Sequence, residues 1–132
     1  MSLDDRGPRV LVVDDDDLIL RFAERVLQDG GYEVVVASSG PQALDIAKAQ
    51  RPFAGFVLDV MMPTMRGDEL ARQLRHMDPD AKVLYFTGHS DVLFEEKVTL
   101  WANEAFVDKP FTVDGLREAV SLLLFGHTHG PR

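Results

Sequence analysis

Three aspartates, a threonine and a lysine are the residues of this sequence best suited to do chemistry, and each follows a short apolar run. They are Asp14, Asp15, Asp59, Thr87 and Lys109. Carboxylate oxygens are the ligands that Mg²⁺ prefers, and a carboxylate can act as a nucleophile that forms an aspartyl phosphate. A hydroxyl and an ammonium group can donate hydrogen bonds to phosphoryl oxygens. The set therefore indicates magnesium-dependent phosphoryl chemistry, provided that the fold brings its members together.

Each of these residues also has an ordinary structural explanation when it is taken alone. Asp14 and Asp15 belong to an acidic run that could cap a helix, and Asp59 could simply end a strand. Thr87 could cap the next helix, and Lys109 could be a solvated surface lysine. Their joint placement is harder to explain in this way, because neighbouring carboxylates repel one another unless a cation lies among them.

Five short apolar runs alternate with five segments that have helical spacing or helix-capping residues. The expected strands are 10–13, 34–36, 56–58, 83–86 and 105–107. The expected helices lie within 18–30, 40–52, 70–77, 91–100 and 112–125. This alternation predicts an α/β fold, a doubly wound five-stranded parallel sheet with helices on both faces. Ligands bind such sheets at the carboxyl ends of the strands, so the five polar residues should converge there.

Length, composition and charge narrow the class of protein. The chain has 132 residues, which fits one domain, and 45% of them are hydrophobic. It has no cysteine, which excludes disulfides and thiolate metal sites, and no apolar run approaches the ~20 residues of a membrane span. The net charge is -8 and the basic residues are scattered, so direct binding to nucleic acid is not expected. We expect a cytoplasmic protein.

Four motifs, in order and each at an expected strand end, resemble those of the response-regulator receiver domain of two-component signalling. They are Val12-Val13-Asp14-Asp15, Leu58-Asp59-Val60-Met61-Met62-Pro63, Phe86-Thr87-Gly88 and Val107-Asp108-Lys109-Pro110-Phe111. The resemblance covers residues 9–125, and we expect 1–8 and 126–132 to be a flexible N-terminus and a flexible tail. It implies a flavodoxin-like strand order, 2-1-3-4-5.

The resemblance also implies roles for the polar residues. Asp59 would accept a phosphoryl group from a histidine kinase or a phosphotransfer protein. Mg²⁺ would be held by Asp14, Asp15, Asp59 and the backbone carbonyl of Met61. Thr87 and Lys109 would contact the phosphoryl group. The chain would thus be a phosphoacceptor rather than an enzyme with independent substrate turnover.

In the same family, phosphorylation is transmitted by a conformational change. Thr87 would move toward the phosphoryl group, and Phe106, the switch aromatic, would turn inward. The output face would be formed by the fourth helix, the fifth strand and the fifth helix, with Leu100 and Trp101 as apolar contacts. The Lys109-Pro110 peptide bond would be cis.

Two other functions remain beside this interpretation. In a phosphatase of the haloacid-dehalogenase type, Asp14 would be the nucleophile and Asp16 the acid, which leaves Asp59 without a role. A pseudo-receiver would have the fold without phosphorylation, but such modules usually lack a key residue, and here all five are present.

Some features of the sequence depart from the usual pattern of the family. Others leave the partners and the context of the domain open. Arg66 stands where an aspartate is commoner. The charge pairs typical of one large class of DNA-binding regulators are not evident in the last two helices, so a phosphorylation-dependent dimer is one option among several. The kinase, the downstream partner, and the choice between a stand-alone regulator and a domain of a longer regulator or hybrid kinase also stay open.

Overall fold

The computed structural model describes residues 7–88, 103–109 and 111–126. Its five strands form one parallel sheet in the order β2-β1-β3-β4-β5. The strands are β1 (Arg9–Val13), β2 (Glu33–Ala37), β3 (Gly55–Leu58), β4 (Val83–Thr87) and β5 (Glu104–Asp108). The predicted strand order and parallel sheet are therefore confirmed.

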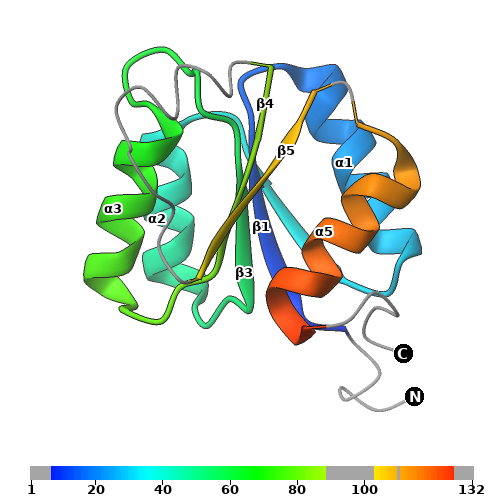
Figure 1. Cartoon of the computed structure of the whole chain (residues 1–132). Helices are drawn as coiled ribbons and strands as arrows, with labels where there is room; N and C mark the ends of the chain where they lie inside the picture. The colour runs from blue at the N-terminus through cyan, green and yellow to red at the C-terminus, as the bar shows by residue number, and fades with distance from the viewer. Residues whose placement is uncertain (1–6, 89–102, 110, 127–132) are drawn as a thin grey trace.

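Helices cover both faces of the sheet. They are α1 (Asp17–Asp29), α2 (Gly40–Gln50), α3 (Gly67–Met77) and α5 (Val113–Phe125). Figure 1 shows α1 and α5 packed on one face and α2 and α3 on the other, with the strands between them. The helix expected at 91–100 lies outside the described residues.

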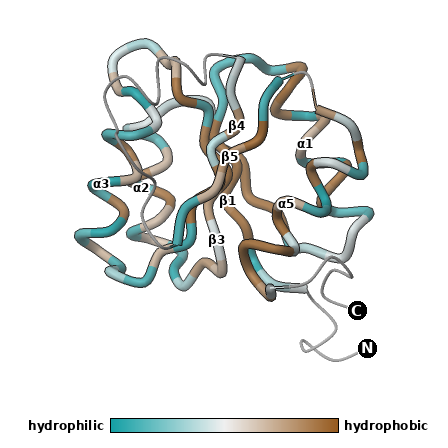
Figure 2. Tube along the Cα trace, viewed as in Figure 1, coloured by the Kyte–Doolittle hydropathy of each residue, from teal (hydrophilic) through white to brown (hydrophobic). Residues whose placement is uncertain are grey.

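The core consists of two apolar layers, one on each face of the sheet. Successive side chains of a strand point to opposite faces, so a continuous apolar run supplies both layers. In β1, Val10 and Val12 pack in the layer beneath α1 and α5. Leu11 and Val13 pack in the layer beneath α2 and α3. Figure 2 shows the hydrophobic positions concentrated along the strands and on the inward sides of the helices.

Side-chain caps fix where three of the helices begin. The Asp16 carboxylate accepts hydrogen bonds from the backbone N–H groups of Leu18 (3.0 Å) and Ile19 (3.4 Å). Ser39 caps α2 and Thr112 caps α5 in the same way. The cap at Asp16 places the start of α1 directly after the two aspartates that follow β1, so their positions are fixed from both sides.

Candidate functional site

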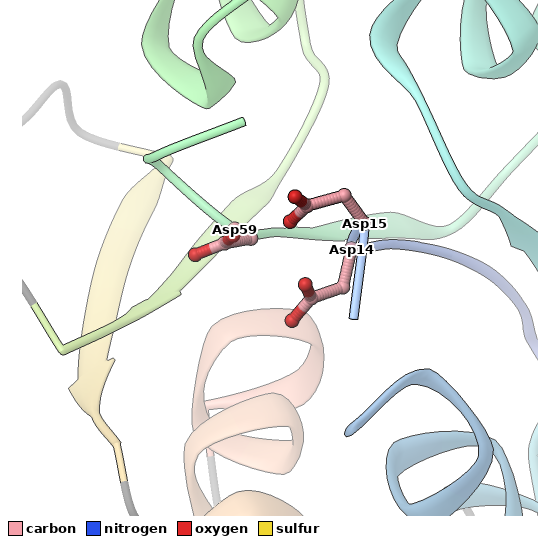
Figure 3. Close-up of side chains that lie close together, drawn as sticks. All are labelled: Asp14, Asp15 and Asp59. Carbon is pink, nitrogen blue, oxygen red and sulfur yellow. The ribbon is translucent and has the colours of Figure 1, made fainter. Parts of the chain in front are cut away.

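The carboxyl ends of neighbouring strands bring the three predicted aspartates together. Asp14 and Asp15 follow β1, and Asp59 follows β3. The two strands pair in register, with Val13 opposite Leu58, so Asp14 and Asp59 occupy adjacent positions at the sheet edge. Figure 3 shows Asp14 and Asp15 branching from the end of β1 beside Asp59. One carboxylate oxygen from each residue lies within 4.8 Å of the others.

Burial and hydrogen bonding distinguish the three carboxylates. Asp14 is fully buried and Asp59 is 4% exposed, whereas Asp15 is exposed to solvent. The Asp14 carboxylate accepts a hydrogen bond from the backbone N–H of Asp16 at 2.8 Å. The Lys109 Nζ lies 2.8 Å from Asp14 Oδ2 and 3.3 Å from Asp59 Oδ1. One ammonium thus bridges the two buried carboxylates, a contact that the sequence analysis did not predict although it expected Lys109 at this edge.

The environment keeps both buried carboxyl groups harder to ionise than usual. Burial, followed by repulsion from the Asp14 carboxylate, raises the pKa of Asp59 to about 6, although Lys109 opposes the shift. Burial also raises the pKa of Asp14 against the opposing hydrogen bond from Lys109. Burial alone would lower the pKa of Lys109, but the hydrogen bond to Asp14 and the charge of Asp59 raise it. The site therefore holds more negative charge than its lysine neutralises.

Thr87 and Phe106 lie on the last two strands of the sheet. Thr87 ends β4 and is fully buried. Its backbone carbonyl accepts a hydrogen bond from the backbone N–H of Lys109 at 2.8 Å. This bond joins the ends of β4 and β5 beside the aspartates. Phe106 pairs with Tyr85 in the β4–β5 register and is 38% exposed. Its side chain therefore faces partly outward, and an inward movement stays a prediction.

Several predicted residues cannot be compared with the structure. Leu100, Trp101 and Pro110 lie outside the described residues, so the output face and the cis Lys109-Pro110 bond stay predictions. Met61 is described, and it lies two residues beyond Asp59 with a half-exposed side chain.

One residue that sequence reasoning missed lies directly against the phosphoacceptor candidate. A Cβ atom added at Gly67 would overlap the backbone carbonyl oxygen of Asp59. The Gly67 N–H also donates a hydrogen bond to the carbonyl of Val60 at 2.9 Å. The first residue of α3 can approach this closely only because it has no side chain. The helix expected from the sequence began only at Leu70, so Gly67 fell outside it.

The dehalogenase-type alternative finds less support in the geometry. Asp16, its proposed acid, uses its carboxylate to cap α1. Asp59, which that alternative leaves without a role, is buried against Asp14 and Lys109.

Comparisons with known proteins identify the family. The family model of the response regulator receiver domain matches residues 10–121. Response regulator MprA of Mycolicibacterium vanbaalenii is 39% identical over 117 residues, which are 88% of this chain and 50% of that protein. Sensor kinase CckA of Brucella abortus is 35% identical over 116 residues, which are 87% of this chain and 12% of that protein. The chain thus spans half or less of the length of these curated relatives.

A solved structure agrees with the sequence comparisons. The crystal structure of response regulator TrrA from Thermotoga maritima, in complex with Mg²⁺ and BeF, superimposes with a TM-score of 0.78. It is 34% identical, and the match covers 89% of this chain and 99% of that chain. Sequence and fold together lead to one conclusion: the chain belongs to the receiver-domain family of two-component response regulators.

Proposed function

We propose that this receiver domain is a phosphorylation switch in which Asp59 accepts a phosphoryl group. The observation that carries the proposal is the buried Asp59 carboxylate, held among two further aspartates with the Lys109 ammonium 3.3 Å away. A nucleophile, a cluster of oxygen ligands and a cation for the incoming charge are the parts that phosphoryl transfer needs. A purely structural cluster gives no reason for the surplus of carboxylates.

The donor is the phosphohistidine of a histidine kinase or of a phosphotransfer protein. An Asp59 carboxylate oxygen attacks phosphorus, a new P–O bond forms, and the P–N bond breaks with its electron pair left on the imidazole nitrogen. Acetyl phosphate can replace the protein donor, in which case a P–O bond breaks and acetate leaves. Lys109 and the Thr87 hydroxyl then donate hydrogen bonds to the phosphoryl oxygens, because both lie at the same edge of the sheet as Asp59.

The residues present fit Mg²⁺. Their ligand atoms are hard carboxylate oxygens within 4.8 Å of one another, and Mg²⁺ typically binds one or two carboxylates together with water and phosphate oxygens. Asp14, Asp15, Asp59 and the Met61 carbonyl would hold the ion. When bound, Mg²⁺ supplies positive charge to the carboxylates and to the phosphoryl oxygens. The related TrrA, crystallised with Mg²⁺ and BeF, supports this assignment.

An exposed apolar surface beside the site suits the phosphohistidine partner. Leu18 is 79% exposed in the first turn of α1, and Phe22 follows one turn later. Both residues lie on α1, which begins just after the two aspartates that follow β1. Leu18→Lys should therefore slow transfer from a histidine kinase and leave labelling by acetyl phosphate unchanged.

Phosphorylation is read out through the β5 side of the domain. Thr87 is drawn toward the phosphoryl group, and Phe106, now 38% exposed, turns into the space that Thr87 leaves. The changed face would be formed by β5, α5 and the helix expected at 91–100, which lies outside the described residues, and it would serve an effector or a dimer partner. Trp101 fluorescence should change when beryllofluoride and Mg²⁺ are added, and an unchanged spectrum would contradict coupling through this face.

The extent of the domain, its role as a phosphoacceptor and its place in the cell are proposed from its membership of the receiver family. Residues 9–125 act as one receiver domain that serves as a phosphoacceptor, not as an enzyme with its own substrate turnover. No helix among the described residues is both long and apolar enough to cross a membrane. We propose that the domain works in the cytoplasm, where its kinase partner would present phosphohistidine, and that it does not bind nucleic acid directly.

Labelling by acetyl phosphate with Mg²⁺ tests the proposal. Intact-mass spectrometry should find one added phosphoryl group on the wild type and on Asp45→Asn, a matched control at an exposed position of α2. Asp59→Asn should not be labelled. Undiminished labelling of Asp59→Asn would move the phosphoacceptor elsewhere, with Asp14 as the first alternative.

A further inference from the structure

The ammonium of Lys109 is enclosed by carboxylates and by an aromatic ring. Its Nζ lies 2.8 Å from Asp14 Oδ2, 3.3 Å from Asp59 Oδ1 and 5.0 Å from the ring centroid of Phe86. Phe86 is fully buried and directly precedes Thr87 in β4. A cation within about 6 Å of a ring centroid is attracted by the negative face of the ring. The ring therefore makes an electrostatic contact with Lys109 in addition to filling the core.

A ring at this position suits a lysine that contacts carboxylates before phosphorylation and phosphoryl oxygens after it. The four-carbon stem of lysine is flexible, so holding its ammonium in one place costs conformational entropy. A carboxylate in place of the ring would compete with Asp59 for the hydrogen bonds of the ammonium. The ring face attracts the charge without accepting a directed hydrogen bond of comparable strength, so the N–H groups stay available to Asp14 and Asp59.

We propose that Phe86 is a positioning residue for Lys109, holding the ammonium at the Asp59 oxygen where the phosphoryl group arrives. The proposal rests on the phosphoacceptor function of Asp59. In phosphoryl transfer, charges that are already in place need no rearrangement as the reaction proceeds, so a preorganised lysine speeds the transfer. Phe86 acts only through Lys109 and touches no reacting atom.

Other aromatic side chains hold the Phe86 ring in its orientation. The Phe111 ring lies 5.7 Å from the Phe86 ring, at an interplanar angle of 65°. The Phe22 ring of α1 packs on Phe111 at 5.6 Å. Edge-to-face and tilted pairs of this kind prefer defined geometries, so they restrict rotation of the Phe86 ring. The face presented to Lys109 is thereby fixed.

Stepwise fluorination of the Phe86 ring separates this role from simple core filling. Mono-, di- and trifluorophenylalanine change the ring volume little but progressively weaken its negative face. If Phe86 positions Lys109, the rate of labelling by acetyl phosphate should fall with each added fluorine, by roughly threefold to tenfold over the series. If Phe86 only fills space, the rate should not follow the fluorine count.

Phe56 provides the matched control. It is a buried phenylalanine on β3 whose ring packs on Phe53 in the opposite apolar layer. Fluorination at Phe56 should leave the labelling rate unchanged, and thermal melting should confirm that both series are folded. A flat rate across the Phe86 series, or an equal decline in both series, would overturn the proposal.

A second measurement tests the geometry without phosphorylation, so failure of the switch function would still leave a result. Protons above the face of an aromatic ring resonate upfield. The Lys109 ε-methylene protons should therefore lie upfield of those of exposed Lys48, and Phe86→Leu should abolish the difference. Equal shifts for the two lysines, or an upfield shift that survives Phe86→Leu, would also overturn the proposal.

Discussion

Two clusters of buried charge in this domain differ in how their charges balance. At the carboxyl end of the sheet, Asp14 and Asp59 share Lys109, with Asp15 close by. At the start of β5, the Glu104 carboxylate is fully buried and is paired with Arg75 of α3. The Tyr85 hydroxyl also donates a hydrogen bond to Glu104 Oε2 at 3.0 Å. Within the described part of the chain, the Glu104 carboxylate is thus contacted by a guanidinium and by a hydroxyl.

The difference separates a structural cluster from the cluster that we propose to be functional. Burial and the Glu104 charge raise the pKa of Tyr85, so the phenol stays protonated as a donor to the carboxylate. In the aspartate cluster, burial and mutual repulsion instead raise the pKa of the carboxyl groups themselves. The buried ion pair between Arg75 and Glu104 joins α3 to the sheet. A surplus of negative charge destabilises the metal-free protein and leaves a place for a cation.

The largest expected effect is the loss of the paired cluster. Arg75→Met should lower the free energy of unfolding by about 3 kcal/mol, because it removes the guanidinium that pairs with the buried Glu104 carboxylate. Urea unfolding measures this. Arg25→Met is the matched control, since Arg25 pairs with Asp29 on the exposed side of α1. If the two variants lost equal stability, the Arg75–Glu104 pair would not be a structural element.

The same chemical change should have opposite effects in the two clusters. Asp59→Asn should raise the free energy of unfolding of the metal-free protein by about 2 kcal/mol at neutral pH, because it removes a carboxylate that burial makes costly to ionise. Glu104→Gln should lower it, because the Arg75 guanidinium then loses its ion pair with Glu104. Stabilisation by both substitutions, or by neither, would remove the distinction between the clusters.

The effect of Asp59→Asn should also depend on pH. The pKa of Asp59 is about 6 in the folded protein and near 3.8 when unperturbed, so the folded state binds more protons between these values. The free-energy cost of holding ionised Asp59 in the folded protein is absent below pH 3.8. It grows as the pH rises and is complete above a pH of about 6. Urea unfolding in EDTA should therefore find a smaller difference between wild type and Asp59→Asn at about pH 4 than at neutral pH. A constant difference would contradict the raised pKa.

Magnesium should produce the smallest of these effects. An ion that binds only the folded protein adds about 1.4 kcal/mol when its concentration is tenfold above Kd. The melting temperature of the wild type and of Asp45→Ala should therefore rise with Mg²⁺, whereas Asp14→Ala should lose most of the response. Equal responses from Asp14→Ala and the wild type would place the ion elsewhere.

Much of the aspartate cluster could be predicted from the sequence, because strand ends meet at one edge of a parallel sheet. Apolar runs marked where β1 and β3 end, and the residues that follow then had to be neighbours. The paired cluster could not be predicted in this way. Arg75 and Glu104 are 29 residues apart, and no local pattern indicates which charged residues of α3 and β5 will meet.

The contacts around Lys109 also needed the fold. The continuous apolar run of β4 predicts that Phe86 is buried, but it does not predict that the ring lies beneath an ammonium. Similarly, Gly67 lay outside the expected helix 70–77, because the helical spacing of apolar residues begins only at Leu70. Such contacts depend on how helices and strands pack against one another. The periodicity of residues within one helix or strand does not predict this packing.

The most direct test of the central claim is to locate the phosphoryl group chemically. Borohydride reduces an acyl phosphate to an alcohol and would convert phosphorylated Asp59 to homoserine. After treatment with acetyl phosphate, Mg²⁺ and then borohydride, peptide mapping by mass spectrometry should find homoserine at position 59 and aspartate at positions 14 and 15. Homoserine at either of those two positions, or intact aspartate at all three, would contradict the assignment of Asp59 as the phosphoacceptor.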